Sequence, residues 1–265
     1  MPDRTVILIT GSSRGIGKAL LSTYLLRPKH TLIAGLRDPT STAALALQDL
    51  PHGTDSKIIT VKIDSTSSTD AQDAAEILVS QHGITKLDMV IANAGVSKYF
   101  GKARVTPATE MADHFAVNAV APLLLFQATA SLLDAAAAAA APTATPTATI
   151  PNGSPKFVVL SSGAGSIGLV ESLPVENTAY GASKAAANFV TRRIHYENPR
   201  LIAFPINPGW LQTDLGNHAA KTAGMTTAPV PIQDGVNGVI DQIDRATRED
   251  TSGQFMAYNG EKVPW

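Results

Sequence analysis

The chain has 265 residues, a net charge of −1 and no cysteine, and 44% of its residues are hydrophobic. The lack of cysteine excludes disulfides, thiolate metal sites and cysteine nucleophiles. The near-neutral charge gives no indication of nucleic acid or of an anionic membrane as a partner, and no cluster of histidines suggests a metal site.

Apolar runs and longer amphipathic stretches alternate along the chain. The expected strands are Thr5–Thr10, Thr31–Leu36, Lys57–Ile63, Leu87–Ala92, Lys156–Ser161, Leu201–Ile206 and Gln254–Ala257. The expected helices are Gly15–Leu26, Thr42–Leu50, Ser68–His82, Ala108–Ala135, Tyr180–Tyr196 and Ile232–Arg245. The strands are continuously apolar, as in parallel strands buried on both faces. We therefore expect an α/β fold, a doubly wound parallel sheet of the Rossmann type with helices on both faces.

Residues 135–155 form a low-complexity segment with seven consecutive alanines followed by a Pro/Thr/Ala tract. We expect a surface insertion, because the segment has little to bury and strands on both sides belong to one sheet pattern. Residues 1–265 are therefore expected to form a single domain. A partner-binding role for the insertion remains open.

The first residues of the chain and its most apolar stretch give expectations about localisation. Met1–Arg4 leads directly into the first strand, which predicts no secretory signal. The stretch Ala119–Leu133 is shorter than the roughly 20 residues that a membrane span needs. We expect a cytoplasmic protein with no membrane partner.

A glycine-rich loop connects the first strand to the first helix. It reads Gly11, Ser12, Ser13, Arg14, Gly15, Ile16 and Gly17. Glycines let the backbone approach a pyrophosphate, and the amide groups at the start of the helix favour the anion. The loop therefore predicts a dinucleotide site, although glycines also serve ordinary turns.

Arg37 follows the second strand, where an acidic residue would bind the ribose hydroxyls of NAD. An arginine there accommodates a 2′-phosphate, and Arg14 in the glycine loop offers a second positive charge. We therefore favour NADP(H) as the cofactor. The alternatives are a solvated arginine in the turn before Pro39, or a ribose contact from Asp38.

Tyr180 and Lys184 are four residues apart on one expected helix, so their side chains share a face. A nearby ammonium favours the phenolate and lowers the pKa of a tyrosine. The pair is a workable general acid–base unit, with two surface residues at a common spacing as the simpler alternative.

Together these motifs resemble the short-chain dehydrogenase/reductase family over nearly the whole chain. The resemblance rests on the glycine loop, Asn93-Ala94-Gly95 after the fourth strand, Ser161-Ser162 after the fifth, Tyr180 with Lys184, and Pro208-Gly209 after the sixth. Within the family, residues 34–39, 195–199 and 208–214 look like the fungal ketoreductase branch that includes norsolorinic acid ketoreductase.

The resemblance implies a role for each matching residue. Tyr180 would protonate the carbonyl oxygen, Ser162 would hydrogen-bond that oxygen, and Lys184 would hold the nicotinamide ribose and lower the pKa of Tyr180. Asn118 would support a water chain from Lys184. The implied cofactor contacts also include Asp64 at the adenine, Thr213 at the carboxamide, and Asn93, Ala94, Gly95, Pro208 and Gly209.

Some of these assignments have alternatives. Ser161 is adjacent to Ser162, and the stretch from Ser162 to Tyr180 is longer than is usual in the family. Asn118 could be an ordinary helix residue, and Asp64 an ordinary turn residue at the end of a strand.

The implied activity is hydride transfer from NADPH to a ketone or aldehyde carbon. The loops expected around the pocket, residues 96–100, 165–175 and 210–225, are mainly apolar, which indicates an apolar carbonyl substrate such as a polyketide or aromatic ketone. The alternatives are sugar-nucleotide epimerisation and a catalytically idle NADP(H) sensor. The resemblance also implies a homodimer or homotetramer.

Overall fold

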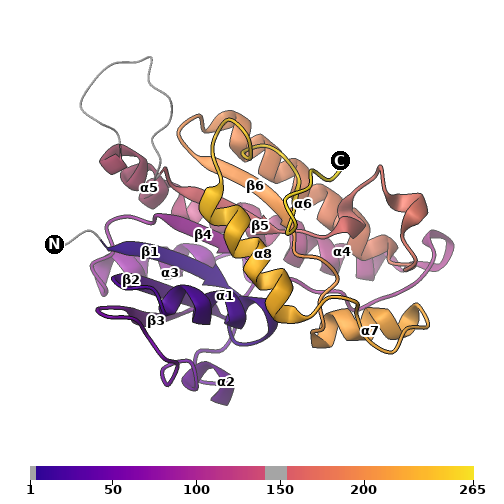
Figure 1. The fold of residues 1–265 in the computed structure, drawn as a ribbon, viewed down its shortest axis with the longest axis horizontal. Coiled ribbons are helices and arrows are strands. Elements are labelled where there is room, and N and C mark those ends of the chain that lie inside the picture. Colours follow the sequence, from indigo (N-terminus) through magenta and orange to yellow (C-terminus); the bar gives the residue numbers. More distant parts are fainter. Residues whose placement is uncertain (1–3, 141–153) are drawn as a thin grey trace.

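The computed structural model describes residues 4–140 and 154–265, and these residues build a seven-stranded parallel sheet (Figure 1). Its strands are β1 (Thr5–Thr10), β2 (His30–Leu36), β3 (Lys57–Lys62), β4 (Met89–Ala92), β5 (Lys156–Leu160), β6 (Ile202–Asn207) and β7 (Met256–Ala257). The order across the sheet is β3-β2-β1-β4-β5-β6-β7. The predicted doubly wound α/β fold is confirmed.

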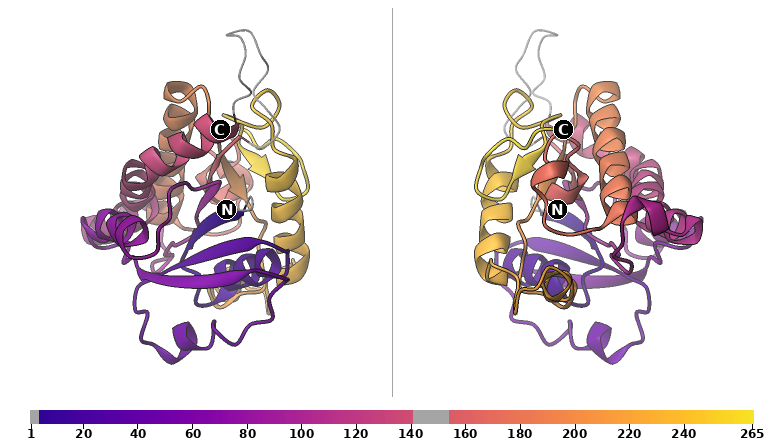
Figure 2. Two further views of the ribbon diagram at one scale, coloured as in Figure 1. Left: turned by 90° about the vertical axis from the view of Figure 1, so that its left-hand side faces the viewer. Right: turned by 90° about the vertical axis from the view of Figure 1, so that its right-hand side faces the viewer.

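Both faces of the sheet are covered by helices. These are α1 (Gly15–Leu25), α2 (Thr42–Leu45), α3 (Asp70–Ser80), α4 (Ala108–Phe115), α5 (Ala121–Ala140), α6 (Thr178–Glu197), α7 (Asp214–Thr222) and α8 (Ile232–Arg245). Side chains alternate along β1, so Ile7 and Ile9 pack with α1 and α8, whereas Val6 and Leu8 pack with α3, α5 and α6. Figure 2 shows α8 on one side of the sheet and the α5 and α6 layer on the other.

The strand order reverses between β1 and β4, which are neighbours in the sheet although β2 and β3 separate them along the chain. In an open parallel sheet, the loops at the carboxyl ends of these strands diverge and leave a crevice for a ligand. The glycine loop after β1 and the residues after β4 lie at this point.

The long helix predicted at Ala108–Ala135 is interrupted by a π-helical turn at Ala116–Val120, and it continues to Ala140. Pro122 explains the interruption. A proline has no N–H for the carbonyl of residue 118, and its ring crowds that carbonyl, so a wider turn accommodates it. Residues 135–140 of the expected insertion therefore belong to α5, and residues 141–153 lie outside the described residues.

Two other helices differ from the expectation. Helix α2 stops at Leu45 and continues as turns, although helix was expected as far as Leu50. Helix α7 was expected to be a loop. It begins where the Thr213 side chain accepts the N–H of Gly216, and it has Asp214 in its first turn and Lys221 in its last. These are the residue types that stabilise the two ends of a helix.

The helical run Ala108–Ala140 is, by length and composition, apolar enough to cross a membrane. The run is 33 residues long, whereas the apolar stretch Ala119–Leu133 considered from the sequence is shorter. Its buried residues Leu125, Leu132 and Leu133 pack in the same core as the strands. Core helices of soluble proteins pass the same test of length and composition.

Candidate active site

The glycine loop bends sharply between β1 and α1. Gly11 and Gly15 have φ angles of +67° and +55°, a region that side chains with a Cβ rarely adopt. A Cβ on Gly17 would lie 2.4 Å from the Gly11 carbonyl oxygen. The side chain of Arg14 is exposed, and Ser13 and Ile16 are half-buried. The loop therefore presents backbone and the start of α1 to a ligand, as a pyrophosphate requires.

The ends of β1 and β4 are tied together. The Asn93 side chain donates to the Thr10 carbonyl oxygen at 2.8 Å, and the backbone N–H groups of Asn93 and Ala94 both donate to the Thr10 hydroxyl at 3.1 Å. Asn93 therefore fixes the ends of β1 and β4 relative to each other, and its predicted cofactor contact stays a prediction. Gly95 is exposed at its edge, and a Cβ there would lie 3.5 Å from the Lys184 ammonium.

Arg37 and Asp38 behave differently at the end of β2. Both are exposed, but one Asp38 carboxylate oxygen accepts the backbone N–H and the hydroxyl of Thr40 at 2.8 and 2.6 Å. These hydrogen bonds, with Arg37 as a smaller contribution, lower the pKa of Asp38. Asp38 is thus engaged in the turn, whereas Arg37 makes no hydrogen bond with the part of the chain that the structure describes.

Asp64 lines an open, shallow depression between β3, β4 and α5. Its Oδ1 atom accepts the N–H and the hydroxyl of Thr66 at 2.9 and 2.8 Å, and its second oxygen makes no hydrogen bond with the described residues. The depression is lined mainly by small and apolar side chains, including Ala92, Ala94 and Pro122. The predicted adenine contact of Asp64 stays a prediction.

Ser162 and Tyr180 meet at the end of β5. A hydrogen bond joins their side chains, and the Ser162 hydroxyl also accepts the N–H of Ala164 at 3.2 Å. Ser161 is buried and points away, since its hydroxyl donates to Asn188 Oδ1 at 2.5 Å. The structure therefore brings Ser162, and not Ser161, to the tyrosine.

Lys184 is buried beneath this pair, and its ammonium donates to the Leu160 carbonyl oxygen at 2.7 Å. The same nitrogen lies 5.8 Å from the centre of the Tyr180 ring. Burial lowers the pKa of Lys184 to about 8. Burial also raises the pKa of Tyr180, and the hydrogen bond with Ser162 lowers it less. The predicted lowering of the Tyr180 pKa by Lys184 stays a prediction.

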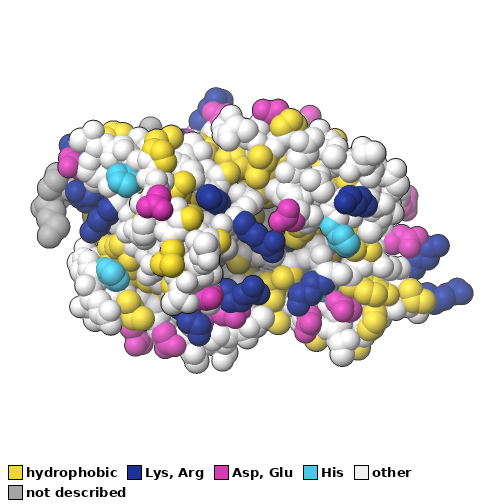
Figure 3. Space-filling model, turned by 90° about the horizontal axis from the view of Figure 1, so that it is seen from below, with side chains coloured by type: hydrophobic (Ala, Val, Ile, Leu, Met, Phe, Trp, Pro, Cys, Tyr) yellow, Lys and Arg dark blue, Asp and Glu magenta, His cyan; other side chains and the backbone are white. Residues whose placement is uncertain are grey.

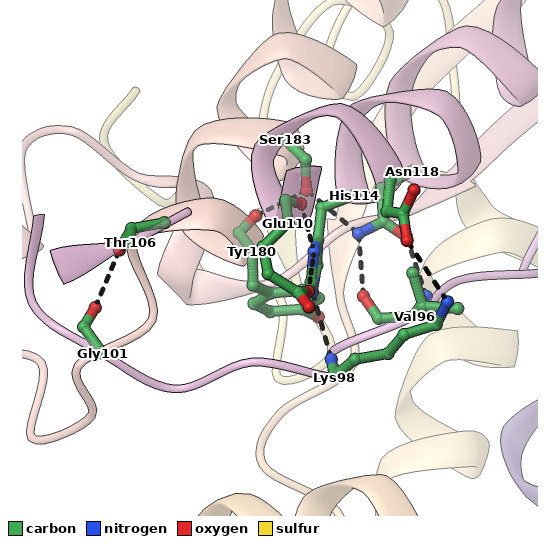
Figure 4. Close-up of polar contacts among 10 residues, drawn as sticks. Val96, Lys98, Gly101, Thr106, Glu110, His114, Asn118, Tyr180 and Ser183 are labelled. Atoms are coloured by element: carbon green, nitrogen blue, oxygen red, sulfur yellow. Dashed lines mark hydrogen bonds and ion pairs between the residues drawn. The ribbon is translucent and has the colours of Figure 1, made fainter. Parts of the chain in front are cut away.

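Asn118 is fully buried in the π-helical turn and joins three segments (Figure 4). Its amide oxygen accepts the Val96 N–H at 2.8 Å. Its amide nitrogen donates to the Val96 carbonyl oxygen at 2.8 Å and to the Ser183 hydroxyl at 2.9 Å. Asn118 thus connects the segment after β4 to the helix that carries Tyr180, and it is not an ordinary helix residue.

Pro208, Gly209 and Thr213 follow β6. Gly209 has a φ of +88°, and Pro208 is buried. The Thr213 methyl group lies near Gly15, since a Cβ there would be 3.9 Å from it. The Thr213 hydroxyl caps α7, so the predicted carboxamide contact would share this side chain with the helix cap.

The face of the molecule seen in Figure 3 carries Lys and Arg side chains along its middle, among hydrophobic side chains. In residues 4–140 and 154–265, no group of three or more His, Asp or Glu side chains could hold a metal ion.

Sequence reasoning missed His114 and Asn188. His114 is fully buried one turn before Asn118, and its spacing of four from that residue was the available signal. Asn188 lies four residues after Lys184 on α6 and holds Ser161. Its spacing of four from Lys184 would have placed Asn188 on the inner face of α6.

Known proteins resemble this chain along its whole length. A family model described as short chain dehydrogenase matches residues 5–224. Proteins named norsolorinic acid ketoreductase from Aspergillus parasiticus and Emericella nidulans are each 41% identical over 266 residues; these matches cover 100% and 99% of this chain and 92% and 94% of the relatives.

Solved structures agree with the sequence matches. The NADPH-bound carbonyl reductase from chicken fatty liver has a TM-score of 0.82 and 26% identity, over 99% of this chain and 100% of that one. A short-chain dehydrogenase/reductase from Burkholderia multivorans with bound NADP has a TM-score of 0.76 and 26% identity, with the same coverage. The chain is therefore an oxidoreductase that belongs to the short-chain dehydrogenase family.

Proposed function

We propose that this protein is an NADPH-dependent reductase of an apolar, aromatic ketone. The observation that carries the proposal is the convergence of Ser162, Tyr180, Lys184 and Asn118 at the carboxyl end of the sheet, beside a loop shaped for a pyrophosphate. The names of the relatives, which include two ketoreductases and a carbonyl reductase, support the same reaction.

When bound, NADPH would supply a hydride for the carbonyl carbon. As negative charge develops on the substrate oxygen, the Ser162 hydroxyl donates a hydrogen bond to it. Tyr180 transfers its phenolic proton to the same oxygen, which completes the alcohol. Because the pKa of Tyr180 is raised, the phenol holds its proton at neutral pH until charge develops on the substrate oxygen.

Lys184 and Asn118 support the proton transfer from Tyr180 to the substrate oxygen. Protonated Lys184 places a positive charge 5.8 Å from the Tyr180 ring, where it stabilises the phenolate left after proton transfer. Asn118 holds Ser183, whose hydroxyl in turn donates to the Tyr180 carbonyl oxygen at 2.7 Å. The helix turn that carries Tyr180 is therefore fixed relative to the segment after β4.

The proposed preference for NADPH over NADH rests on Arg37 and Asp38, the two residues that follow β2. Asp38, the residue that could bind ribose hydroxyls, is occupied by Thr40, whereas the exposed Arg37 is available for a 2′-phosphate. Arg14 faces Asp214 at 3.3 Å in an exposed pair of the kind that contributes little to stability, so it also remains usable by an anion.

The proposed apolar character of the substrate rests on exposed apolar side chains in the loops expected around the pocket. Ile167 and Val170, which follow Ser162 in the chain, are 74% and 62% exposed, and Leu215 and Met225 are 41% and 38% exposed. Three lysines could address an acidic substrate: Lys98 and Lys102 face Asp113 at 3.8 Å and Glu176 at 3.4 Å, and Lys221 lies in the last turn of α7. The proposal of an apolar aromatic compound therefore rests on the exposed apolar groups alone.

The test is loss of NADPH absorbance with a panel of ketones: acetophenone, 1-tetralone and 9,10-phenanthrenequinone, with acetone as the small control. We expect turnover of the aromatic members and a preference for NADPH over NADH. In Arg37→Ala the preference should fall by about tenfold or more, because a charged hydrogen bond contributes about 1.5–3 kcal/mol.

NADPH binding without oxidation across the whole panel would instead favour a sensor that binds the cofactor and does no chemistry. An unchanged cofactor preference in Arg37→Ala would remove Arg37 from the proposal and leave the reductase assignment in place.

A further inference from the structure

His114 is a fully buried histidine that the proposed reaction does not use. It lies at the end of α4, four residues before Asn118, so the two side chains share one face of the helical run. Figure 4 shows both of them pointing toward the segment that follows β4.

The hydrogen bonds of His114 define its protonation. The backbone N–H of Lys98 donates to Nε2 at 3.1 Å, so Nε2 must carry a lone pair. Nδ1 lies 2.7 Å from the Glu110 carbonyl oxygen, which can only accept. Both contacts are satisfied by one neutral tautomer, with the proton on Nδ1.

His114 and Asn118 together hold alternate residues of one segment. Asn118 binds the N–H and the carbonyl oxygen of Val96, and His114 binds the N–H of Lys98. The helical run thus offers this segment the partners that a neighbouring strand would otherwise provide.

The other end of the segment is attached to the helix of Tyr180. The Gly101 N–H donates to the Glu176 carbonyl oxygen at 2.7 Å, and the Thr178 hydroxyl donates to the Gly101 carbonyl oxygen at 3.2 Å. Between these points, the Phe100 ring lies 5.3 Å from the His218 ring of α7. Residues 96–101 therefore run from Asn118 to the start of α6, with Phe100 against α7.

We propose that His114 is a positioning residue for the ketone: its neutral imidazole fixes Lys98 and so sets the place of Tyr99 and Phe100 in the segment expected beside the substrate pocket. The proposal rests on the reductase function proposed above. The imidazole touches no reacting atom and acts only through the backbone of residue 98.

Glu110 lies beside the imidazole. Its Oε2 atom, 3.7 Å from His114 Nδ1, is a buried side-chain oxygen without a hydrogen-bond partner among the described residues. The arrangement requires the neutral ring, because a proton on Nε2 would remove the acceptor for the N–H of Lys98.

Other titratable groups lie on the surrounding elements. Asp113 is on α4 and pairs with the Lys98 side chain, and α6, which packs along α4, carries Tyr180 and Lys184. His218 of α7 faces Phe100.

The test compares His114→Leu, which fills the space without an acceptor, with His114→Gln, whose amide oxygen can stand in for Nε2 and does not titrate. At about pH 7.5 we expect the KM for the ketone to rise about tenfold in His114→Leu, because a buried N–H is left without a partner. We expect kcat within about threefold, an unchanged Kd for NADPH, and a KM close to the wild-type value in His114→Gln. A wild-type KM in His114→Leu overturns the proposal.

A second variant keeps the comparison available if His114→Leu fails to fold. His114→Met fills the space with a flexible apolar side chain. A wild-type KM for the ketone in His114→Met would likewise overturn the proposal.

Hydrogen exchange of the NADP-bound protein gives a readout that does not depend on turnover. The amides of residues 96–100 should exchange faster in His114→Leu and at the wild-type rate in His114→Gln. If the wild type reduces no ketone, the reductase function fails, but this exchange pattern still decides whether His114 holds the segment. Equal exchange in all three proteins would show that it does not.

Discussion

Burial changes the acid–base behaviour of the two residues that the sequence pairs on α6. Spacing alone correctly predicts that Tyr180 and Lys184 share a face, but it cannot show where the ammonium points. The ammonium lies against the Leu160 carbonyl, and burial moves the two pKa values in opposite directions. The neutral form is favoured for both side chains, as desolvation requires.

The lowered pKa of Lys184 predicts a pH dependence of stability. An unfolded lysine keeps its proton to about pH 10.5, whereas the folded one loses it near pH 8. Between these values the unfolded state binds more protons, so the free energy of unfolding should rise with pH. Below pH 8 both states are protonated, and the group contributes no slope.

Lys184→Met should abolish this contribution. In urea titrations the wild type should gain up to about 3 kcal/mol relative to the variant between pH 8 and 10.5, since one pKa unit corresponds to about 1.36 kcal/mol. Lys57→Met, on an exposed strand end, is the matched control. A difference between wild type and Lys184→Met that stays constant over this range would show that the ammonium is not destabilised by burial.

The choice between Ser161 and Ser162 also depends on where a single side chain points. The two adjacent serines after β5 are indistinguishable by composition, and only backbone direction decides between them. Successive residues of an extended chain point to opposite sides, so one of the pair reaches Tyr180 and the other reaches Asn188.

Among the elements, the strands and the glycine loop were predictable because their signals are local. Apolar runs gave all seven strands to within two residues at each end, and the loop stands where a strand ends and a helix begins. Helix α7 was missed because its sequence is polar and short, although Thr213 and Asp214 are typical of a helix start. The π-helical turn was missed because it depends on how Pro122 is accommodated within a long helix.

A substitution at Gly17 tests how closely helix α1 approaches the glycine loop. A Cβ at this position would meet the Gly11 carbonyl oxygen at 2.4 Å, and a backbone atom cannot move aside as a flexible side chain can. Gly17→Ala should therefore lower the free energy of unfolding by about 1–3 kcal/mol and weaken NADPH binding.

The two effects can be measured by chemical denaturation and by fluorescence titration with NADPH. Gly163→Ala is the control for stability, because the nearest atom to its Cβ would be at an ordinary 3.4 Å. Wild-type stability and affinity in Gly17→Ala would mean that α1 is not held this close to the loop.

At the scale of the whole molecule, the sheet brings residues that are far apart in the sequence to one edge. Residues 11, 93, 118, 162 and 180 approach one another because parallel strands end on the same side. The direction of this convergence was predictable from the order of strands and helices, whereas the cross-links that fix it, such as His114 to Lys98, were not.

The predicted homodimer or homotetramer stays a prediction. The outer face of α6 offers a surface for it, since Phe189 and Tyr196 are seven residues apart and 67% and 74% exposed. Two large aromatic side chains exposed on one helix face favour contact with another protein surface.

The central claim is that Tyr180 supplies the proton during ketone reduction, and Tyr180→Phe tests it most directly. The measurement is kcat for NADPH-dependent reduction of an aromatic ketone, with the Kd for NADPH determined on the same samples. We predict a fall in kcat of about 10²–10⁴-fold, the usual contribution of a general acid, with the Kd changed by less than about threefold. A variant that keeps the wild-type kcat would contradict the account.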